Sequence, residues 1–401
     1  MPSPSARAGW TLCAIALLAG TALTARSAAP DIALSGNDNH TTVVDGKPRG
    51  LANAKPDNVS VIDVSSFPPR LVATVDVPFS DIGPPMAIAI GPDASYALVT
   101  ASTKADPGAP DGASPDDRVS VLDLTVSPPR VVQTVHAGTG ATAVRITPDG
   151  TMALVTNRNA GTVSVFTIAD RRLSPAGTVD LGNPKSIPQG LIISRDGKTA
   201  LVSRTGDNTI NVLHIAGTTI TVDPRPLTAG FAPDTMDLDA AGDLAVVTSV
   251  GRGDGDVDTV SLIDMKAAPP RVIDAVPVPS GPESAKFSPD GSMLAVISIN
   301  GSIKAPGNIF YHDQGMLTLY AVQPPEPGAP TQAGRRLKRL AEAPAGGWAQ
   351  GVAFSRDGGM ILAQNFRDHK LIAFRWQNGA LGQAVTLDLP GGPAAFATPW
   401  P

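Results

Sequence analysis

The sequence predicts an all-β protein built from repeated four-stranded units, and three observations support this prediction. First, 40 of the 401 residues are Gly and 39 are Pro, and both end helices and central strands but are well tolerated in turns. Second, 42% of the residues are hydrophobic, so the chain can bury a large core. Third, turn signals recur between short apolar segments along the chain. These features argue against a helical bundle, an ordinary Rossmann enzyme and a disordered chain.

The first 29 residues have the pattern of a secretory signal peptide. Arg7 precedes an apolar stretch at residues 10–25, and small residues follow, so we expect cleavage near residues 25–29. The single cysteine, Cys13, lies inside this segment and lacks the preceding small residue of a lipoprotein signal. We therefore expect a periplasmic or secreted protein without a membrane span after cleavage, whose residues 30–401 form one cysteine-free domain.

The charge of the chain limits the kinds of partner that it can bind. The chain has 31 Lys and Arg against 36 Asp and Glu, a net charge of -5, and no basic run that could follow a phosphate backbone. We expect no nucleic-acid partner, and we expect a monomer.

A hairpin turn of the Pro-Asp-Gly type recurs along the chain, each time between two short apolar runs. Pro presets φ for such a turn and Gly accepts a positive φ, so each copy predicts a β-hairpin. The six copies lie at residues 91–93, 147–150, 194–197, 239–242, 288–291 and 355–358.

A second signature is a Val-Ser-Val-Ile-Asp-like run at 59–63, 119–123 and 260–264, each followed by Pro-Pro-Arg. Asp123 and Asp264 are 141 residues apart, which corresponds to three units of about 47 residues. Four strands in such a unit are typical of a β-propeller blade. We expect the acids that end these runs to accept hydrogen bonds from the turn that follows, with each Arg covering a neighbouring strand edge.

Counting the units predicts seven blades of four antiparallel strands. Innermost strands are expected to begin near residues 84, 141, 188, 233, 282 and 349, and a seventh copy occupies 392–399, at the end of the chain. Residues 32–39 resemble a second strand without a first. We therefore expect the C-terminal inner strand to join three N-terminal strands in one blade, which closes the ring.

These repeats resemble the YVTN-repeat β-propellers, a seven-bladed, WD40-like family of the lactonase-like superfamily. The resemblance rests on Leu-Val-Thr-Asn at 154–157 and on the Pro-Asp-Gly hairpins, and it spans about residues 31–401. It implies the fold, whereas the superfamily contains lactonases, redox-enzyme subunits, surface-layer proteins and binding modules. The Arg, His and Glu set of the lactonase branch has no motif match here, so the resemblance assigns no catalytic residue.

Four long loops are predicted on one face of the ring, which we call the top face: residues 37–58, 102–118, 250–258 and 300–315. They either surround a binding site or are tolerated surface extensions.

Beneath these loops, polar residues are expected at the ends of the second strands and the starts of the inner strands. They could converge on an axial ligand site, or only solvate a water-filled channel. The predicted ligand-binding residues are Asn37, Asn157, Gln189, Arg204, Asn300, Gln350 and Asn365. If the protein is an enzyme, Arg204 with Glu283 or Asp234 are the catalytic candidates.

No cofactor is evident. Asp254, Asp256 and Asp258 alternate as calcium ligands could, but the later Glu of a calcium loop is missing, so a solvated acidic turn is the preferred interpretation. The five His residues are scattered, and we expect no zinc site. Haem-attachment, Walker and Gly-x-Ser-x-Gly motifs are absent.

Three functional hypotheses remain. The first is a binding module that engages a small molecule or a protein through the top-face loops and channel mouth. The alternatives are a lactonase-like hydrolase acting at the axial pocket, and an accessory subunit of a periplasmic redox enzyme.

Overall fold

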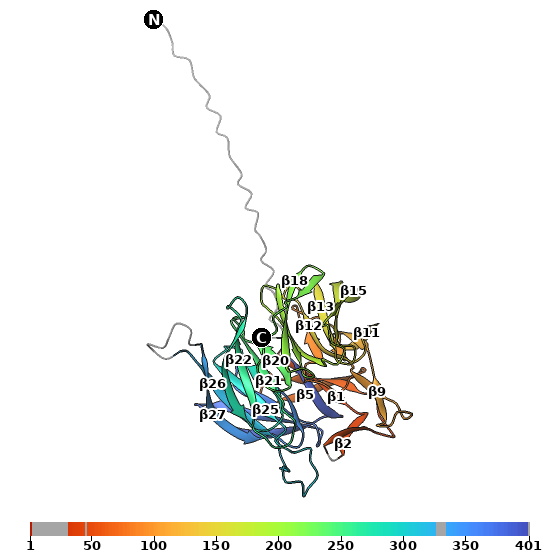
Figure 1. The fold of residues 1–401 in the computed structure, drawn as a ribbon, viewed down its shortest axis with the longest axis vertical. Helices are drawn as coiled ribbons and strands as arrows, with labels where there is room; N and C mark the ends of the chain where they lie inside the picture. Colours follow the sequence, from red (N-terminus) through yellow and green to blue (C-terminus); the bar gives the residue numbers. More distant parts are fainter. Residues whose placement is uncertain (2–30, 45, 326–333, 400–401) are drawn as a thin grey trace.

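The computed structural model describes residues 1, 31–44, 46–325 and 334–399, and all its regular secondary structure is β (Figure 1). The predicted signal peptide lies almost wholly outside these residues. Within them, no helix has the length and apolar character needed to cross a membrane.

Seven four-stranded antiparallel sheets form a ring, which confirms the predicted propeller. From inner to outer strand, the first blade is β32 (Gly392–Ala397), β1 (Ile32–Asp38), β4 (Asn58–Asp63) and β5 (Arg70–Asp76), and the second is β6 (Ile88–Ile90), β7 (Tyr96–Thr100), β10 (Arg118–Asp123) and β11 (Arg130–His136). The third blade is β12 (Ala141–Ile146), β13 (Met152–Asn157), β14 (Thr162–Ala169) and β15 (Arg172–Asp180). The fourth is β16 (Pro188–Ile193), β17 (Thr199–Arg204), β18 (Thr209–Ala216) and β19 (Thr219–Val222). The other three are β20–β21–β22–β23 (Pro233–Leu238, Leu244–Ser249, Asp258–Asp264, Arg271–Val278), β24–β25–β26–β27 (Pro282–Phe287, Met293–Ser298, Met316–Gln323, Arg336–Pro344) and β28–β29–β30–β31 (Ala349–Phe354, Met360–Asn365, Lys370–Gln377, Ala380–Asp388).

The chain ends close the ring as predicted. The C-terminal β32 pairs with β1 in a register that places Leu34 opposite Ala397 and Asp38 opposite Gly392. Inner strands of neighbouring blades contact each other around the whole circle, including β32 with β6. One boundary differs from the prediction, because the inner strand expected near residue 84 begins at Ile88. Each inner strand is hydrogen-bonded only to the second strand of its blade, and its free edge lies inside the closed ring, where another chain cannot pair with it.

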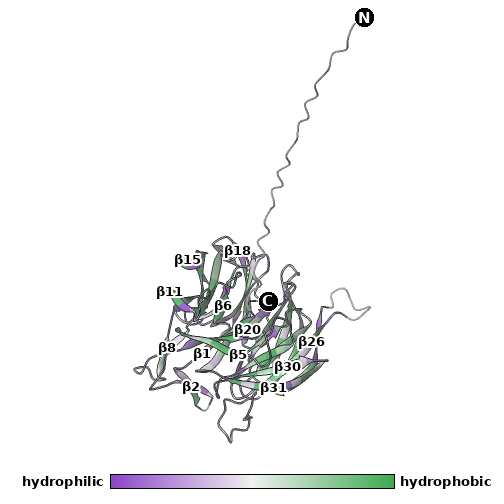
Figure 2. Cartoon of the chain, turned by 180° about the vertical axis from the view of Figure 1, so that it is seen from behind, coloured by the Kyte–Doolittle hydropathy of each residue, from purple (hydrophilic) through white to green (hydrophobic). Residues whose placement is uncertain are grey.

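Burial follows position within the blade. Every residue of the second strands β13 and β21 is buried, whereas the outer strand β5 is mostly exposed or half-buried. The second strands lie between the neighbouring blades and have both faces covered, so the first four residues of β13 and of β21 are apolar and the polar residues that end them are buried. Hydrophobic residues, green in Figure 2, lie along the strands of the blades.

The hairpin turns have the predicted chemistry. At 147–150, the Gly150 amide donates to the Thr147 carbonyl at 2.8 Å, and Gly150 has a φ of 74°. The Asp149 carboxylate accepts from the Thr151 amide at 3.0 Å. The hydrogen bond from the Thr147 hydroxyl lowers the pKa of Asp149 most, and the bond from the Thr151 amide lowers it further.

The acids that end the third strands also behave as predicted. Asp123 accepts a hydrogen bond from the Thr125 amide at 3.0 Å. The Arg of each Pro-Pro-Arg segment, however, pairs with this acid, where a contact with a neighbouring strand edge was expected. The pairs are Arg70–Asp63 at 3.3 Å, Arg130–Asp123 at 3.7 Å and Arg271–Asp264 at 3.7 Å.

The long top-face loops pack against one another. The first two contain the small hairpins β2–β3 (Thr41–Val44, Lys47–Gly50) and β8–β9 (Thr103–Ala105, Ala113–Pro115), and the Gly50 amide donates to the Asp111 carbonyl at 2.6 Å. Arg49 forms an ion pair with Asp111. The other two loops meet where Phe310 lies against Gly255, leaving no room for a Cβ. The loops thus form a packed layer on this face.

Candidate functional site

A β-bulge interrupts the start of the inner strands, at the end of the channel beneath the long loops. In β20, Pro233 pairs with Ser249 and Met236 with Val247, so Asp234 and Thr235 together face one partner residue. The β24 register slips in the same place, which leaves Glu283 unpaired. Equivalent bulges occur in β12, β16 and β28. Bulges redirect side chains out of the regular alternation, so they can present these residues at the channel mouth.

Hydroxyl groups of the second strands fix the bulges and tie the blades together. Ser203 Oγ accepts from the Gly190 amide of its own blade at 2.7 Å and donates to the Asp234 carbonyl of the next blade at 2.6 Å. Thr156 Oγ1 joins the preceding two blades in the same way: it accepts from the Ala143 amide of its own blade and donates to the Gln189 carbonyl of the next blade at 2.7 Å. The backbone at the mouth is therefore held by bonds that cross the blade boundaries.

Four predicted residues occupy the second position of consecutive inner strands: Gln189, Asp234, Glu283 and Gln350. Asp234 is 4% exposed, and its Oδ1 has no hydrogen-bond partner among the described residues. The Oε1 atoms of Gln189 and Gln350 are likewise buried and unpartnered there. Buried polar atoms are normally satisfied, so a group of unsatisfied ones at one channel end indicates a place for a polar ligand or water.

The electrostatics of this mouth come from two acids and one guanidinium. Burial raises the pKa of Asp234 to about 7, and the positive charge of Arg158 opposes the rise. Burial also raises the pKa of Glu283 well above its usual range, and the charge of Asp234 adds to the effect. Burial lowers the pKa of Arg158, whereas the negative charges of Asp234 and Asp81 act to raise it. The site therefore combines an acid that titrates near neutral pH, Asp234, with a second acid, Glu283, whose pKa is also raised by burial.

Arg158 was not among the residues predicted from the sequence. It follows the second strand β13 directly, in a tight loop where its amide donates to the Gly140 carbonyl at 2.8 Å.

Arg204, the cation that the sequence placed with Asp234 or Glu283, has other partners. Its Nη1 donates to the Leu181 carbonyl at 3.0 Å and to Asn211 Oδ1 at 2.9 Å, and its Nη2 pairs with Asp207. The guanidinium thus fastens the top of its own blade, and Arg158 supplies the charge that acts on Asp234.

The asparagines predicted to bind ligand are likewise engaged within their blades. Asn37 Nδ2 donates to Asn58 Oδ1 at 2.7 Å and to Ser60 Oγ at 2.9 Å. The amides of the other three bond to nearby groups of their own blades: Asn157 to Thr162 and Ser164, Asn300 to the Gln314 carbonyl, and Asn365 to Asp368. These side chains join second strands to the segments that follow, which accounts for their repetition.

The three calcium candidates do not converge. Asp258 is buried and accepts from the Gly281 amide at 2.8 Å, whereas Asp256 is exposed and Asp254 half-buried. These acids form no cluster with ligand spacing in the described part of the chain.

A separate cavity of about 340 Å³ lies at the opposite end of the channel, lined by the last residues of the inner strands. Its charged groups include Arg145, Asp237 and Lys286, and Lys286 Nζ pairs with Asp237 Oδ1 at 2.7 Å. Burial lowers the pKa of Arg145 to about 10, and the charge of Asp237 opposes this. Because its acid is already paired, this cavity offers no free acid for catalysis, and the top mouth is the stronger candidate.

Comparison with known proteins agrees with this architecture. Residues 120–226 match the family model described as "Lactonase, 7-bladed beta-propeller", which confirms the resemblance to the lactonase-like propellers. No curated protein matches the chain significantly.

Solved structures show the same ring. A periplasmic gluconolactonase from Pseudomonas aeruginosa is similar with a TM-score of 0.64 and 17% identity, over 91% of this chain and 98% of that one. A proposed 6-phosphogluconolactonase from Bacteroides uniformis gives 0.67 and 15%, over 91% and 98%. Hydrazine synthase from Kuenenia stuttgartiensis gives 0.54 and 21%, over 74% and 78%. At these identities the likeness establishes the fold alone.

Proposed function

We propose that this lactonase-like propeller is a hydrolase that opens a lactone of a sugar acid at the top mouth of its channel. The observation that carries the proposal is the pair of acids at the mouth, the buried Asp234 and the half-buried Glu283, both with raised pKa values, together with the charge of Arg158. The lactonase family match and the gluconolactonase named above support a hydrolase over the binding module that the sequence placed first.

The three groups have distinct roles in the proposed reaction. Asp234, whose pKa is about 7, accepts a proton from a water molecule as that water adds to the lactone carbonyl carbon. The guanidinium of Arg158 stabilises the negative charge that develops on the carbonyl oxygen. Glu283 donates its proton to the ring oxygen as the ester C–O bond breaks. Lactone and water thereby give the open hydroxy acid, with both carboxyl groups restored by proton exchange.

The charge of the mouth favours an unphosphorylated lactone. Arg158 is accompanied by Asp234, Glu283 and, farther along the same rim, Asp81. A phosphate group would therefore meet more acids than cations in this part of the structure, and its binding would be opposed whenever those acids ionise. A neutral polyhydroxy lactone can instead use the unpartnered amide oxygens of Gln189 and Gln350.

The test compares lactone hydrolysis by the wild type with two matched variants of one strand. We expect the wild type to hydrolyse glucono-δ-lactone above the buffer rate and faster than its 6-phosphate. Asp234→Asn should lower kcat by about 10²- to 10⁴-fold, because it removes the general base. Asp237→Asn, three residues along β20 and outside the site, should retain the rate. The proposal fails if the folded wild type opens no lactone, or if Asp234→Asn is as active as Asp237→Asn.

A further inference from the structure

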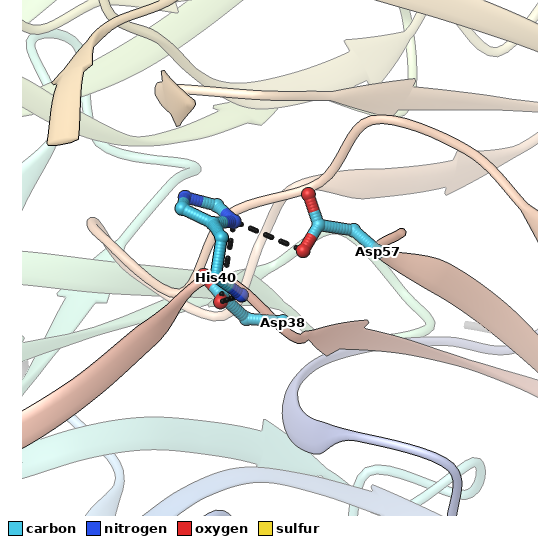
Figure 3. Close-up of side chains that lie close together, drawn as sticks. All are labelled: Asp38, His40 and Asp57. Carbon is cyan, nitrogen blue, oxygen red and sulfur yellow. Dashed lines mark hydrogen bonds and ion pairs between the residues drawn. The ribbon is translucent and has the colours of Figure 1, made fainter. Parts of the chain in front are cut away.

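A second group of titratable side chains lies among the top-face loops of the closing blade, and one of its members, Asp81, also acts electrostatically on Arg158 of the channel mouth. Asp38 ends β1, His40 precedes β2, Asp57 precedes β4, and Asp81 lies in the link between β5 and β6. Figure 3 shows Asp38 and Asp57 directed at the same edge of the His40 ring. His40 Nδ1 lies 2.9 Å from Asp57 Oδ1 and 3.3 Å from Asp38 Oδ1.

These distances are those of neighbouring ligands around one metal ion. One ligand atom from each of Asp38, His40 and Asp57 lies within 4.8 Å of the other two, and no other triad in the described residues reaches this spacing. Tetrahedral ligands with bonds of about 2.0–2.1 Å stand about 3.3 Å apart. The three side chains are therefore arranged for coordination without rebuilding the backbone.

An independent observation concerns Asp81, which is 4% exposed. Both carboxylate oxygens of Asp81 lack a hydrogen-bond partner among the described residues, as does the buried Oγ1 of Thr41. Asp81 is held against the cluster, because its amide donates to Asp38 Oδ2 at 3.0 Å, and the charge of Asp38 adds to the rise in its pKa that burial causes. Burial disfavours the ionised form of a carboxyl group that has no partner, and a bound cation would remove that penalty.

The surroundings of the ring also suit coordination. His40 Nε2 lies 3.2 Å from Thr103 Oγ1, which contacts Ser80 Oγ at 2.7 Å. Ligating histidines commonly use their second nitrogen in such an outer hydrogen bond, which fixes the ring. No Lys or Arg of the described residues forms an ion pair with Asp38, Asp57 or Asp81. His40 is therefore the only cationic group paired with these carboxyl groups in the described part of the chain.

We propose that Asp38, His40 and Asp57 bind one divalent transition-metal ion of the Zn²⁺ or Mn²⁺ type, with the Asp81 carboxyl group beside them. Two carboxylates with one imidazole form a mixed oxygen and nitrogen donor set, which suits these ions better than Ca²⁺, whose ligands are oxygens. The ion links the β1–β4 loop to the segment that leads into the next blade. This proposal does not depend on the proposed hydrolysis, and it revises the expectation of no zinc site that the scattered histidines gave.

The experiment titrates chelator-treated full-length protein with Zn²⁺, Mn²⁺ and Ca²⁺ by isothermal calorimetry. We expect one Zn²⁺ or Mn²⁺ per chain, weaker Ca²⁺ binding, and a metal-dependent rise in Tm. His40→Gln and Asp81→Asn should each weaken binding at least tenfold. His214→Gln, which changes an exposed His paired with Asp223, is the control and should bind like the wild type.

A spectroscopic measurement on the unmutated protein keeps the test valid if a variant fails to fold. Co²⁺ added to the stripped wild type should give visible absorption bands of a site with nitrogen and oxygen ligands, and Zn²⁺ should displace them. The proposal is overturned if the folded wild type binds none of these ions at one per chain. It is also overturned if folded His40→Gln and Asp81→Asn both bind as the wild type does.

Discussion

Replacing Asp234 with Asn should make the protein more stable at neutral and alkaline pH. The carboxyl group is 4% exposed, and burial raises its pKa from 3.8 to about 7. Since each pKa unit corresponds to about 1.4 kcal/mol, the ionised form costs the folded state about 4 kcal/mol. Asn has nearly the same shape and does not ionise, so it avoids that cost.

The pH dependence follows from the direction of this change. The folded protein holds the Asp234 proton more tightly than the unfolded chain does, so the carboxyl group favours folding most below about pH 4. This contribution is lost as the pH rises through about 7. The variant and the wild type should therefore be similar at pH 4, and the variant should be more stable by about 4 kcal/mol at pH 8.

The assay is urea unfolding of both proteins at several pH values, followed by circular dichroism and tryptophan fluorescence. Asp237→Asn is the control, because Asp237 pairs with Lys286, and its loss should destabilise the protein at neutral pH. If Asp234→Asn is less stable than the wild type at pH 8, or if their difference does not change with pH, the reasoning about a strained buried acid is refuted.

Three further predictions concern the site and the ring. Arg158→Gln should lower kcat by about 10²-fold and move the rise of the pH–rate profile to higher pH, because the guanidinium now lowers the pKa of Asp234; an unchanged profile would contradict this. Ser203→Ala should destabilise the fold in urea by about 1 to 3 kcal/mol for each of the two buried groups it orphans, the Gly190 amide and the Asp234 carbonyl, whereas a Ser203→Thr control should lose less. Removing residues 394–401 should lower the Tm of the whole ring in a single transition, and a normal Tm would show that β32 is dispensable.

The fold could be predicted from the sequence because the same hairpin turn recurs in successive repeat units. A Pro-Asp-Gly hairpin has a local cause, which the Thr147 and Asp149 contacts show, so each copy could be located without tertiary information. The unmatched copies at the two chain ends then implied that β32 completes the blade of β1. Among the inner strands, β6 differed from the prediction in its boundary, because it begins at Ile88 and the prediction was near residue 84.

The site could be predicted only in part, because the position of a residue in the repeat does not show whether its side chain faces the channel or bonds within its own blade. The inner-strand residues, such as Asp234 and Glu283, were found by their position, and the bulges that expose them depend on pairing with the second strand. Asn157 and Arg204 occupy equally suggestive positions but are engaged in bonds within their own blades. Arg158 was missed because its effect on Asp234 crosses blade boundaries.

The cluster of Asp38, His40 and Asp57 was missed for a similar reason. His40 and Asp57 are separated by 17 positions in a long loop, and Asp81 lies beyond two further strands. A search for histidines at short ligand spacing has no reason to join them. Only the pairing of β1 with β4, which brings Asn37 opposite Asn58, places the two ends of that loop side by side.

The pH dependence of kcat/KM for glucono-δ-lactone tests the central claim most directly. If Asp234 is the general base of a channel-mouth hydrolase, kcat/KM of the wild type rises with an apparent pKa near 7, and Asp234→Asn loses both that rise and most of the rate. A rate that is independent of pH between 5 and 9, or a full rate in folded Asp234→Asn, would contradict the account.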